Sequence, residues 1–180
     1  MNTNLIIFVL EGQFDGDFLF QLKQQISTVF QIQLQFVEGN LQLEKYFDSE
    51  RKQYNAEKLI KDLDSLQFDP GAKKIGLFRV DLFIPILTYI FGQAYFRGNT
   101  GVVSLYRLRN EQYGLKPDGL ILYDRFYKVI LHELGHTFGL VHCHVPDCVM
   151  RSSTYVEDID QKKSSFCPDC MKQLSGQFDQ

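Results

Sequence analysis

The chain has 180 residues, of which 44% are hydrophobic and 14% aromatic, enough for a packed core and too many for a disordered chain. The formal net charge of −3, with no basic stripe, argues against a nucleic-acid partner. No apolar run approaches the roughly 20 residues of a membrane span, and no Lys or Arg precedes Leu5–Leu10 as in a signal peptide. We therefore expect one cytoplasmic, monomeric domain, 1–180, with no membrane partner.

The first part of the chain predicts a β-α-β unit. Leu5–Leu10 is an unbroken apolar run, as in a strand buried on both faces. After a turn-rich break, apolar residues recur at three- and four-residue steps and predict a helix that begins near Asp17. Glutamines then alternate with apolar residues over 31–36, which is the period of a strand with one wet face.

The middle of the chain predicts the rest of a sheet of about five strands. Asn55 is expected to cap a helix of about three turns. Residues 74–82, 88–91 and 102–108 are rich in β-branched and aromatic residues and are expected to be strands. Asp124 is expected to cap a long helix that carries the first histidines. Together these elements predict an α+β fold.

The sequence HELGHTFGLVH, from His132 to His142, fits the pattern HExxHxxGxxH at every specified position. Because residues four apart share one face of a helix, His132 and His136 can bind one ion. Gly139 can adopt the positive φ that ends a helix and brings His142 to the same ion. Glu133 can serve as the general base.

Three protein ligands leave a fourth position of Zn²⁺ for water, whose pKa falls to about 7. Glu133 can take a proton from that water and return it to a leaving amine, so the predicted reaction is hydrolysis of an amide. The alternative is a buried helix whose histidines only pack, but five specified positions arise by chance on the order of once in 10⁵ chains of this length. Met150 is expected as an apolar floor beneath the ligands, or else as an ordinary core methionine.

All four cysteines follow the histidine motif as two short pairs. They are Cys143, Cys148, Cys167 and Cys170. In a reducing compartment this spacing favours a closed, structural zinc site, which would stabilise a tail with few large apolar residues. The alternatives are two disulfides, free thiols, or a site in which His144 replaces Cys143.

Pro168 suits the first turn of a helix, so Cys170 would lie near a helix N-terminus, where the partial positive charge favours the thiolate. Arg151, Lys162 and Lys163 could offset the remaining negative charge.

The string HELGHTFGLVHCHVPDCVM, followed by FCPDC, resembles the archaemetzincins, a branch of the metzincin metallopeptidases. FGQA at 91–94 and VVSLYRL at 102–108 extend the resemblance to about half of the chain. It implies a zincin-like fold with a twisted mixed sheet and two long helices in an upper subdomain, 1–142, and a small zinc-stapled subdomain, 143–180. It also implies roles for individual residues. These are His132, His136 and His142 for catalytic zinc, Glu133 as base, Met150 in the Met-turn, and Cys143, Cys148, Cys167 and Cys170 for structural zinc.

The predicted function is therefore that of a zinc-dependent peptidase with two zinc ions and a peptide or protein substrate. An extended peptide could pair with an edge strand, for which 102–108 is the candidate, unless that strand is internal. Tyr155 is a candidate donor to the oxyanion, or else a packing tyrosine. The alternative function is a zinc-containing peptide-binding or scaffold protein with little turnover, and Glu133 favours the enzyme.

Overall fold

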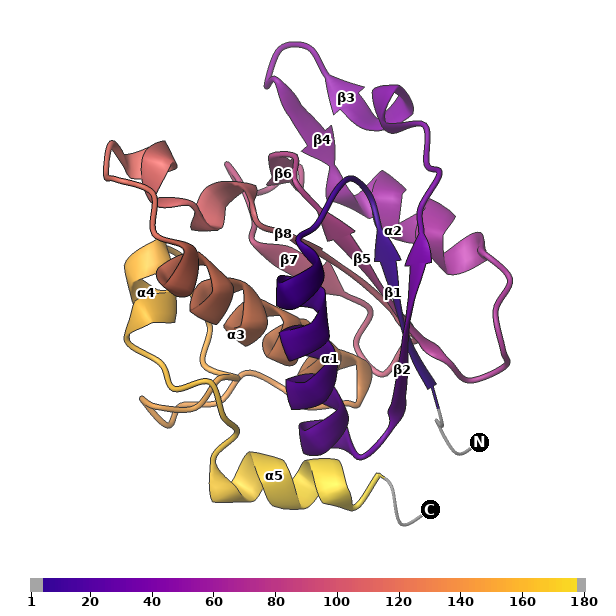
Figure 1. Ribbon diagram of the computed structural model, residues 1–180, viewed down its shortest axis with the longest axis vertical. Coiled ribbons are helices and arrows are strands. Elements are labelled where there is room, and N and C mark those ends of the chain that lie inside the picture. Colours follow the sequence, from indigo (N-terminus) through magenta and orange to yellow (C-terminus); the bar gives the residue numbers. More distant parts are fainter. Residues whose placement is uncertain (1–4, 178–180) are drawn as a thin grey trace.

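The computed structural model describes residues 5–177, and within them a five-stranded mixed sheet forms the centre (Figure 1). Its strands, in spatial order, are β2 (Gln33–Glu38), β1 (Leu5–Leu10), β5 (Lys73–Phe78), β8 (Thr100–Ser104) and β7 (Gly92–Ala94). The first four are parallel, and β7 runs antiparallel to β8. A smaller sheet contains β3 (Phe47–Asp48), β4 (Gln53–Asn55) and β6 (Leu82–Phe83).

Helices cover both faces of the main sheet (Figure 1). The long helices α1 (Gly16–Phe30) and α3 (Gly119–Thr137) pack on one face, and α2 (Ala56–Ser65) packs on the other. Alternation along β1 explains the two layers, since Ile6 and Phe8 join the core with α1 and α3, whereas Ile7 and Val9 join the core with α2. The short helices are η1 (Leu43–Tyr46), η2 (Tyr106–Leu108), η3 (Asn110–Tyr113), α4 (Val156–Asp160) and α5 (Pro168–Ser175).

The helix starts agree with the sequence for α1 and α2 and differ for α3. Asn55 caps α2 as expected, with its side chain accepting from the backbone N–H of Lys58. Helix α1 begins at Gly16, close to the expected start near Asp17, and Asp15 is its cap. The expected cap of α3 at Asp124 is wrong, because Asp118 accepts two backbone N–H groups at 3.0 Å and starts the helix earlier.

Three of the expected strands have different bounds. The strand expected at 74–82 ends at Phe78, and Leu82–Phe83 belongs to the smaller sheet. Residues 88–91 form only an isolated bridge through Ile90. The strand expected at 102–108 is β8, which ends at Ser104 and lies between β5 and β7, so it is internal and the edge strand is β7.

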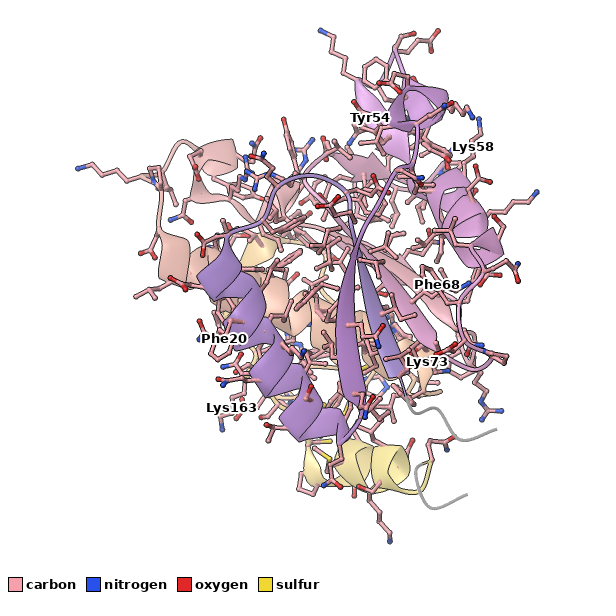
Figure 2. The ribbon with its side chains drawn as sticks, turned by 45° about the vertical axis from the view of Figure 1, so that its right-hand side comes forward. Phe20, Tyr54, Lys58, Phe68, Lys73 and Lys163 are labelled. Carbon is pink, nitrogen blue, oxygen red and sulfur yellow. The ribbon has the colours of Figure 1, made fainter. Side chains whose placement is uncertain are left out.

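The tail after α3 packs into the same core as the sheet. Arg125 of α3 donates two hydrogen bonds of 2.7 Å to the carboxylate of Asp160 in α4. The rings of Phe30 and Phe166 meet edge to face, with centroids 6.1 Å apart. Figure 2 shows Tyr54 at the end of the molecule far from α5. The expected C-terminal subdomain, 143–180, is described as far as residue 177.

None of the helices in residues 5–177 is long and apolar enough to cross a membrane.

Candidate metal centre and active site

Three histidine side chains converge at the end of α3. His132 and His136 lie on one face of the helix, and Gly139, with φ of 87°, turns the chain so that His142 reaches the same place. Their ligand nitrogens all lie within 4.8 Å of one another. The sharp helix end is held by the carbonyl of His136, which accepts from the backbone N–H groups of Gly139 and Arg97.

Backbone carbonyls determine which nitrogens of two histidines carry protons. Nδ1 of His132 lies 2.9 Å from the carbonyl of Val149, and Nδ1 of His136 lies 2.8 Å from that of Leu140. Because a carbonyl only accepts, both Nδ1 atoms must carry hydrogen, which leaves lone pairs on both Nε2 atoms. These Nε2 atoms are 3.0 Å apart, and burial lowers the pKa of His132 to about 3.

Two lone pairs at that distance repel each other unless a cation lies between them. Ligands at about 2.0–2.1 Å from a tetrahedral Zn²⁺ are roughly 3.3 Å apart, close to the separation of these nitrogens. Neutral imidazoles are ligands that suit Zn²⁺, and those of His132 and His136 are each oriented by a second hydrogen bond through Nδ1. The three histidines therefore fit a zinc ion.

Glu133 points away from α3 toward the edge strand. A Cβ on Gly92 of β7 would lie 2.8 Å from its Oε1 atom, so a glycine is needed at that position. The side chain is 6% exposed, and burial raises the pKa of Glu133 to about 8, while the nearby Lys162 opposes this rise. Within the described residues its carboxyl oxygens make no hydrogen bond, and the side chain lines the cavity in front of the histidines.

Met150 lies fully buried beneath the histidines. A Cβ on Gly135 would come within 2.4 Å of its sulfur, and the ring of Phe166 is the next neighbour on that side. The thioether thus packs directly against the backbone of α3 between the two helical histidines, as the expected apolar floor requires.

A cavity of about 470 Å³ opens in front of the histidines, within the usual range for a ligand site. One wall is β7 with the preceding loop, the floor is α3, and the other wall is the segment 152–162. Its lining includes Gly92, Gln93, Ala94, Val129, His132, Glu133, His136, His142, Ser153, Tyr155, Ile159 and Lys162. Among the described residues, two buried atoms of this lining, Gln93 Oε1 and Ser153 Oγ, lack a hydrogen-bond partner.

The four cysteine sulfurs form a second cluster, also within 4.8 Å of one another. Sγ atoms of Cys143 and Cys167 are 3.8 Å apart, close to the roughly 3.8 Å expected for two thiolates at about 2.3 Å from a tetrahedral Zn²⁺. Backbone hydrogen bonding from Cys170 lowers the pKa of Cys167, which caps α5 ahead of Pro168. His144 is exposed and lies outside this cluster, and all four thiols are free rather than in disulfides.

Residues 17–176 match the family model described as Peptidase family M54. The chain belongs to this family. The archaemetzincin of Pyrococcus abyssi is 38% identical over 177 residues, covering 94% of each chain. That of Pyrococcus horikoshii is 41% identical over 140 residues, covering 76% of this chain and 74% of its own.

Two solved structures of such proteins share the fold. An archaemetzincin from Methanopyrus kandleri superposes with a TM-score of 0.85 at 29% identity, covering 99% of this chain and 97% of its own. A zinc-dependent peptidase from Methanocorpusculum labreanum superposes with a TM-score of 0.84 at 29% identity, covering 94% and 99%. The resemblance to archaemetzincins, the zincin-like mixed sheet and the expectation of a metallopeptidase are therefore confirmed, and the scaffold alternative is not favoured.

Sequence reasoning missed several residues around this M54 cleft. Lys162 was expected to offset the charge of the thiolates, but its ammonium instead donates to the carbonyls of Val149 and Arg151 and lines the cleft. Gly92 and Gly135 have no reactive group, so nothing in the sequence was a reason to select them. The structure shows that a Cβ would collide with Glu133 at Gly92 and with Met150 at Gly135. Tyr155 lies at the cleft with an exposed side chain, and its role toward an oxyanion stays a prediction.

Proposed function

We propose that the chain hydrolyses peptide bonds at a zinc ion held by His132, His136 and His142, with Glu133 as the general base. The chain is a zinc metallopeptidase of family M54. The observation that supports this residue assignment best is that the Nε2 atoms of His132 and His136 lie 3.0 Å apart, each with a lone pair. The buried carboxyl group of Glu133, which makes no hydrogen bond within the described residues, lines the same cavity.

When bound, Zn²⁺ would supply a Lewis acid that makes a water molecule acidic near pH 7 and polarises the scissile carbonyl. Glu133 would take the proton from the attacking water on a carboxylate oxygen and return it to the nitrogen of the leaving amine. Burial, which raises the pKa of Glu133 to about 8, makes its carboxylate a stronger base toward that water. The carbonyls of Val149 and Leu140 would keep the two imidazole rings in place through their Nδ1–H groups.

The edge strand β7 is the proposed docking strand for an extended peptide. The carbonyl of Phe91 accepts from the N–H of Ser104, and the N–H of Tyr95 donates to the carbonyl of Thr100. In an antiparallel pair this alternation directs the backbone N–H and C=O groups of Gly92 and Ala94 away from β8. Both residues line the cavity. A substrate strand bonded there would lie over α3, with its reacting carbonyl near the histidines. Gln93 Oε1 would offer it a further acceptor.

We infer a second, structural zinc ion at Cys143, Cys148, Cys167 and Cys170, because four sulfurs leave no open position. The segment 1–142 and the tail from 143 onward would then act as one domain, since both contribute to one core. That the chain is monomeric stays a prediction.

The test of the catalytic assignment is Glu133→Gln, which keeps the shape of the side chain and removes the proton acceptor. We expect kcat to fall by about 10² to 10⁴ on any peptide that the wild type cleaves, because the general base is lost. Zinc content, measured by elemental analysis, should not change.

The matched control is Glu44→Gln, which changes an exposed glutamate of η1 outside the cleft in the same way. It should cleave like the wild type. If Glu133→Gln and Glu44→Gln both retain wild-type kcat at full zinc content, Glu133 is not the base. If the zinc-loaded wild type binds a broad peptide library without cleaving any member, the peptidase assignment fails.

A further inference from the structure

Lys162 is a buried lysine without an acidic partner. Its side chain is 5% exposed, and its ammonium donates to the carbonyls of Val149 at 3.2 Å and Arg151 at 2.6 Å. No carboxylate in residues 5–177 lies within salt-bridge distance of it. Its neighbour Lys163, in contrast, is exposed and pairs with Asp147 at 2.7 Å.

This arrangement leaves one donor of Lys162 unused. An ammonium has three N–H groups, and the two carbonyls accept two of them. The residue also belongs to the lining of the active-site cleft, beside the apolar side chains of Val129 and Ile159. Burial in this setting is costly for an unpaired charge, because solvation is lost without an ion pair to replace it.

Charges of both signs surround Lys162, but no carboxylate of the described residues is in contact with it. Glu133 and Asp158 act to stabilise its charge, whereas Lys128 and Arg151 oppose it. Lys128 is itself buried and already paired with Asp124 at 2.6 Å, and Glu133 lies against Gly92 on the β7 wall of the cleft.

We propose that the recess between α3 and the segment 152–162 receives a carboxylate of the peptide substrate, and that Lys162 selects for it. The carboxylate belongs to an Asp or Glu side chain next to the scissile bond or to the C-terminus of a short peptide. In the partly apolar recess a charge-assisted hydrogen bond to the third N–H of Lys162 is stronger than in water. This inference rests on the proposed function, since it assigns a substrate preference to the same cleft.

The test compares peptides that differ only in charge. One set of peptides has Glu or Gln at the position before or after the scissile bond, which tests for a side-chain carboxylate. Each of these peptides is made with a free and with an amidated C-terminus, which tests for a terminal carboxylate. We expect the wild type to favour one carboxylate-bearing member by at least about tenfold in kcat/KM. Lys162→Met should remove this preference mainly by slowing the acidic peptide, and Lys162→Arg should retain part of it.

Lys163→Met is the matched control, because it removes the adjacent lysine from the surface, and it should keep the wild-type preference. Calorimetric binding of the same peptides to zinc-loaded Glu133→Gln gives a readout that does not need turnover, so a failure of hydrolysis would not hide the result. Equal affinity and equal kcat/KM for all members in proteins with intact Lys162 would overturn the inference. So would an equal loss for acidic and amide peptides in Lys162→Met, which would make the lysine a structural brace of the Met150 turn.

Discussion

Gly135 lies between His132 and His136, at a position that the HExxH pattern leaves unspecified. Any Cβ there would meet the sulfur of Met150 at 2.4 Å, and Met150 is fully buried and cannot move into solvent. The sulfur and the helix backbone therefore define how far apart α3 and the Met150 turn lie. This turn also provides the Val149 carbonyl that orients His132.

Gly135→Ala should destabilise the protein and weaken zinc binding at the histidines. Overpacking a buried site costs about 1–3 kcal/mol, of which the better helix propensity of alanine returns only about 1 kcal/mol. Urea unfolding and competitive zinc titration would measure both effects. Gly16→Ala is the control, because a Cβ there meets nothing within 4 Å. If both variants match the wild type, the close contact of Met150 with α3 is not a constraint.

At the level of single residues, the sequence was informative where chemistry requires a fixed spacing. The HExxHxxGxxH pattern predicted that three histidines and a carboxylate lie together, and these side chains do converge on one cavity. Lys162 could not be assigned in the same way, because its place in the cleft depends on how the tail folds back over α3. No local pattern distinguishes it from the exposed Lys163 beside it.

Lys73 joins three elements at the end of the sheet. It is the first residue of β5, and its ammonium donates to the carbonyls of Gly98 and Thr137 and to the side chain of Asn99 at 2.8–3.0 Å. It also lies 5.0 Å from the ring centre of Phe138. A cation at the C-terminus of α3 is favourable, because carbonyls there carry partial negative charge.

Lys73→Met should lower the free energy of unfolding by about 1–3 kcal/mol, because the buried carbonyl of Thr137 loses its partner. The loop from α3 to His142 should exchange its amide hydrogens faster. Lys58→Met is the control, since Lys58 lies exposed on α2 (Figure 2). Equal unfolding curves for the two variants would show that Lys73 does not brace α3.

At the level of elements, periodic patterns predicted the helices and strands well and their ends poorly. Asp118 and Asp124 are equally good caps by type, and only Asp118 has extended backbone geometry with two N–H groups in reach. Likewise, 102–108 is rich in β-branched and other large apolar residues, yet its last three residues form η2. Strand order was not readable either, because pairing partners lie far apart in sequence.

At the level of the whole molecule, the tail packs into one core with α3 and the sheet, and the proposed structural zinc ion would hold it there. Cys167→Ser should reduce the zinc content from two ions to one and lower the melting temperature, because binding energy in a structural site is also folding energy. Limited proteolysis should then cut after Cys143. The control is Asp169→Asn, an exposed change in the first turn of the same helix, α5. A single zinc ion in the wild type, or unchanged protease resistance in Cys167→Ser, would contradict the stapling model.

The position of β1 in the sheet also determines when the molecule can fold. This first strand needs β2 on one side and β5 on the other, and β5 in turn needs β8. At a synthesis rate of about 5–20 residues per second, an apolar edge of β1 stays without a partner for several seconds. Pairings this distant in sequence also fold slowly, over roughly milliseconds to seconds. The nascent chain therefore exposes an apolar strand edge early, well before the histidine cluster at 132–142 has been made.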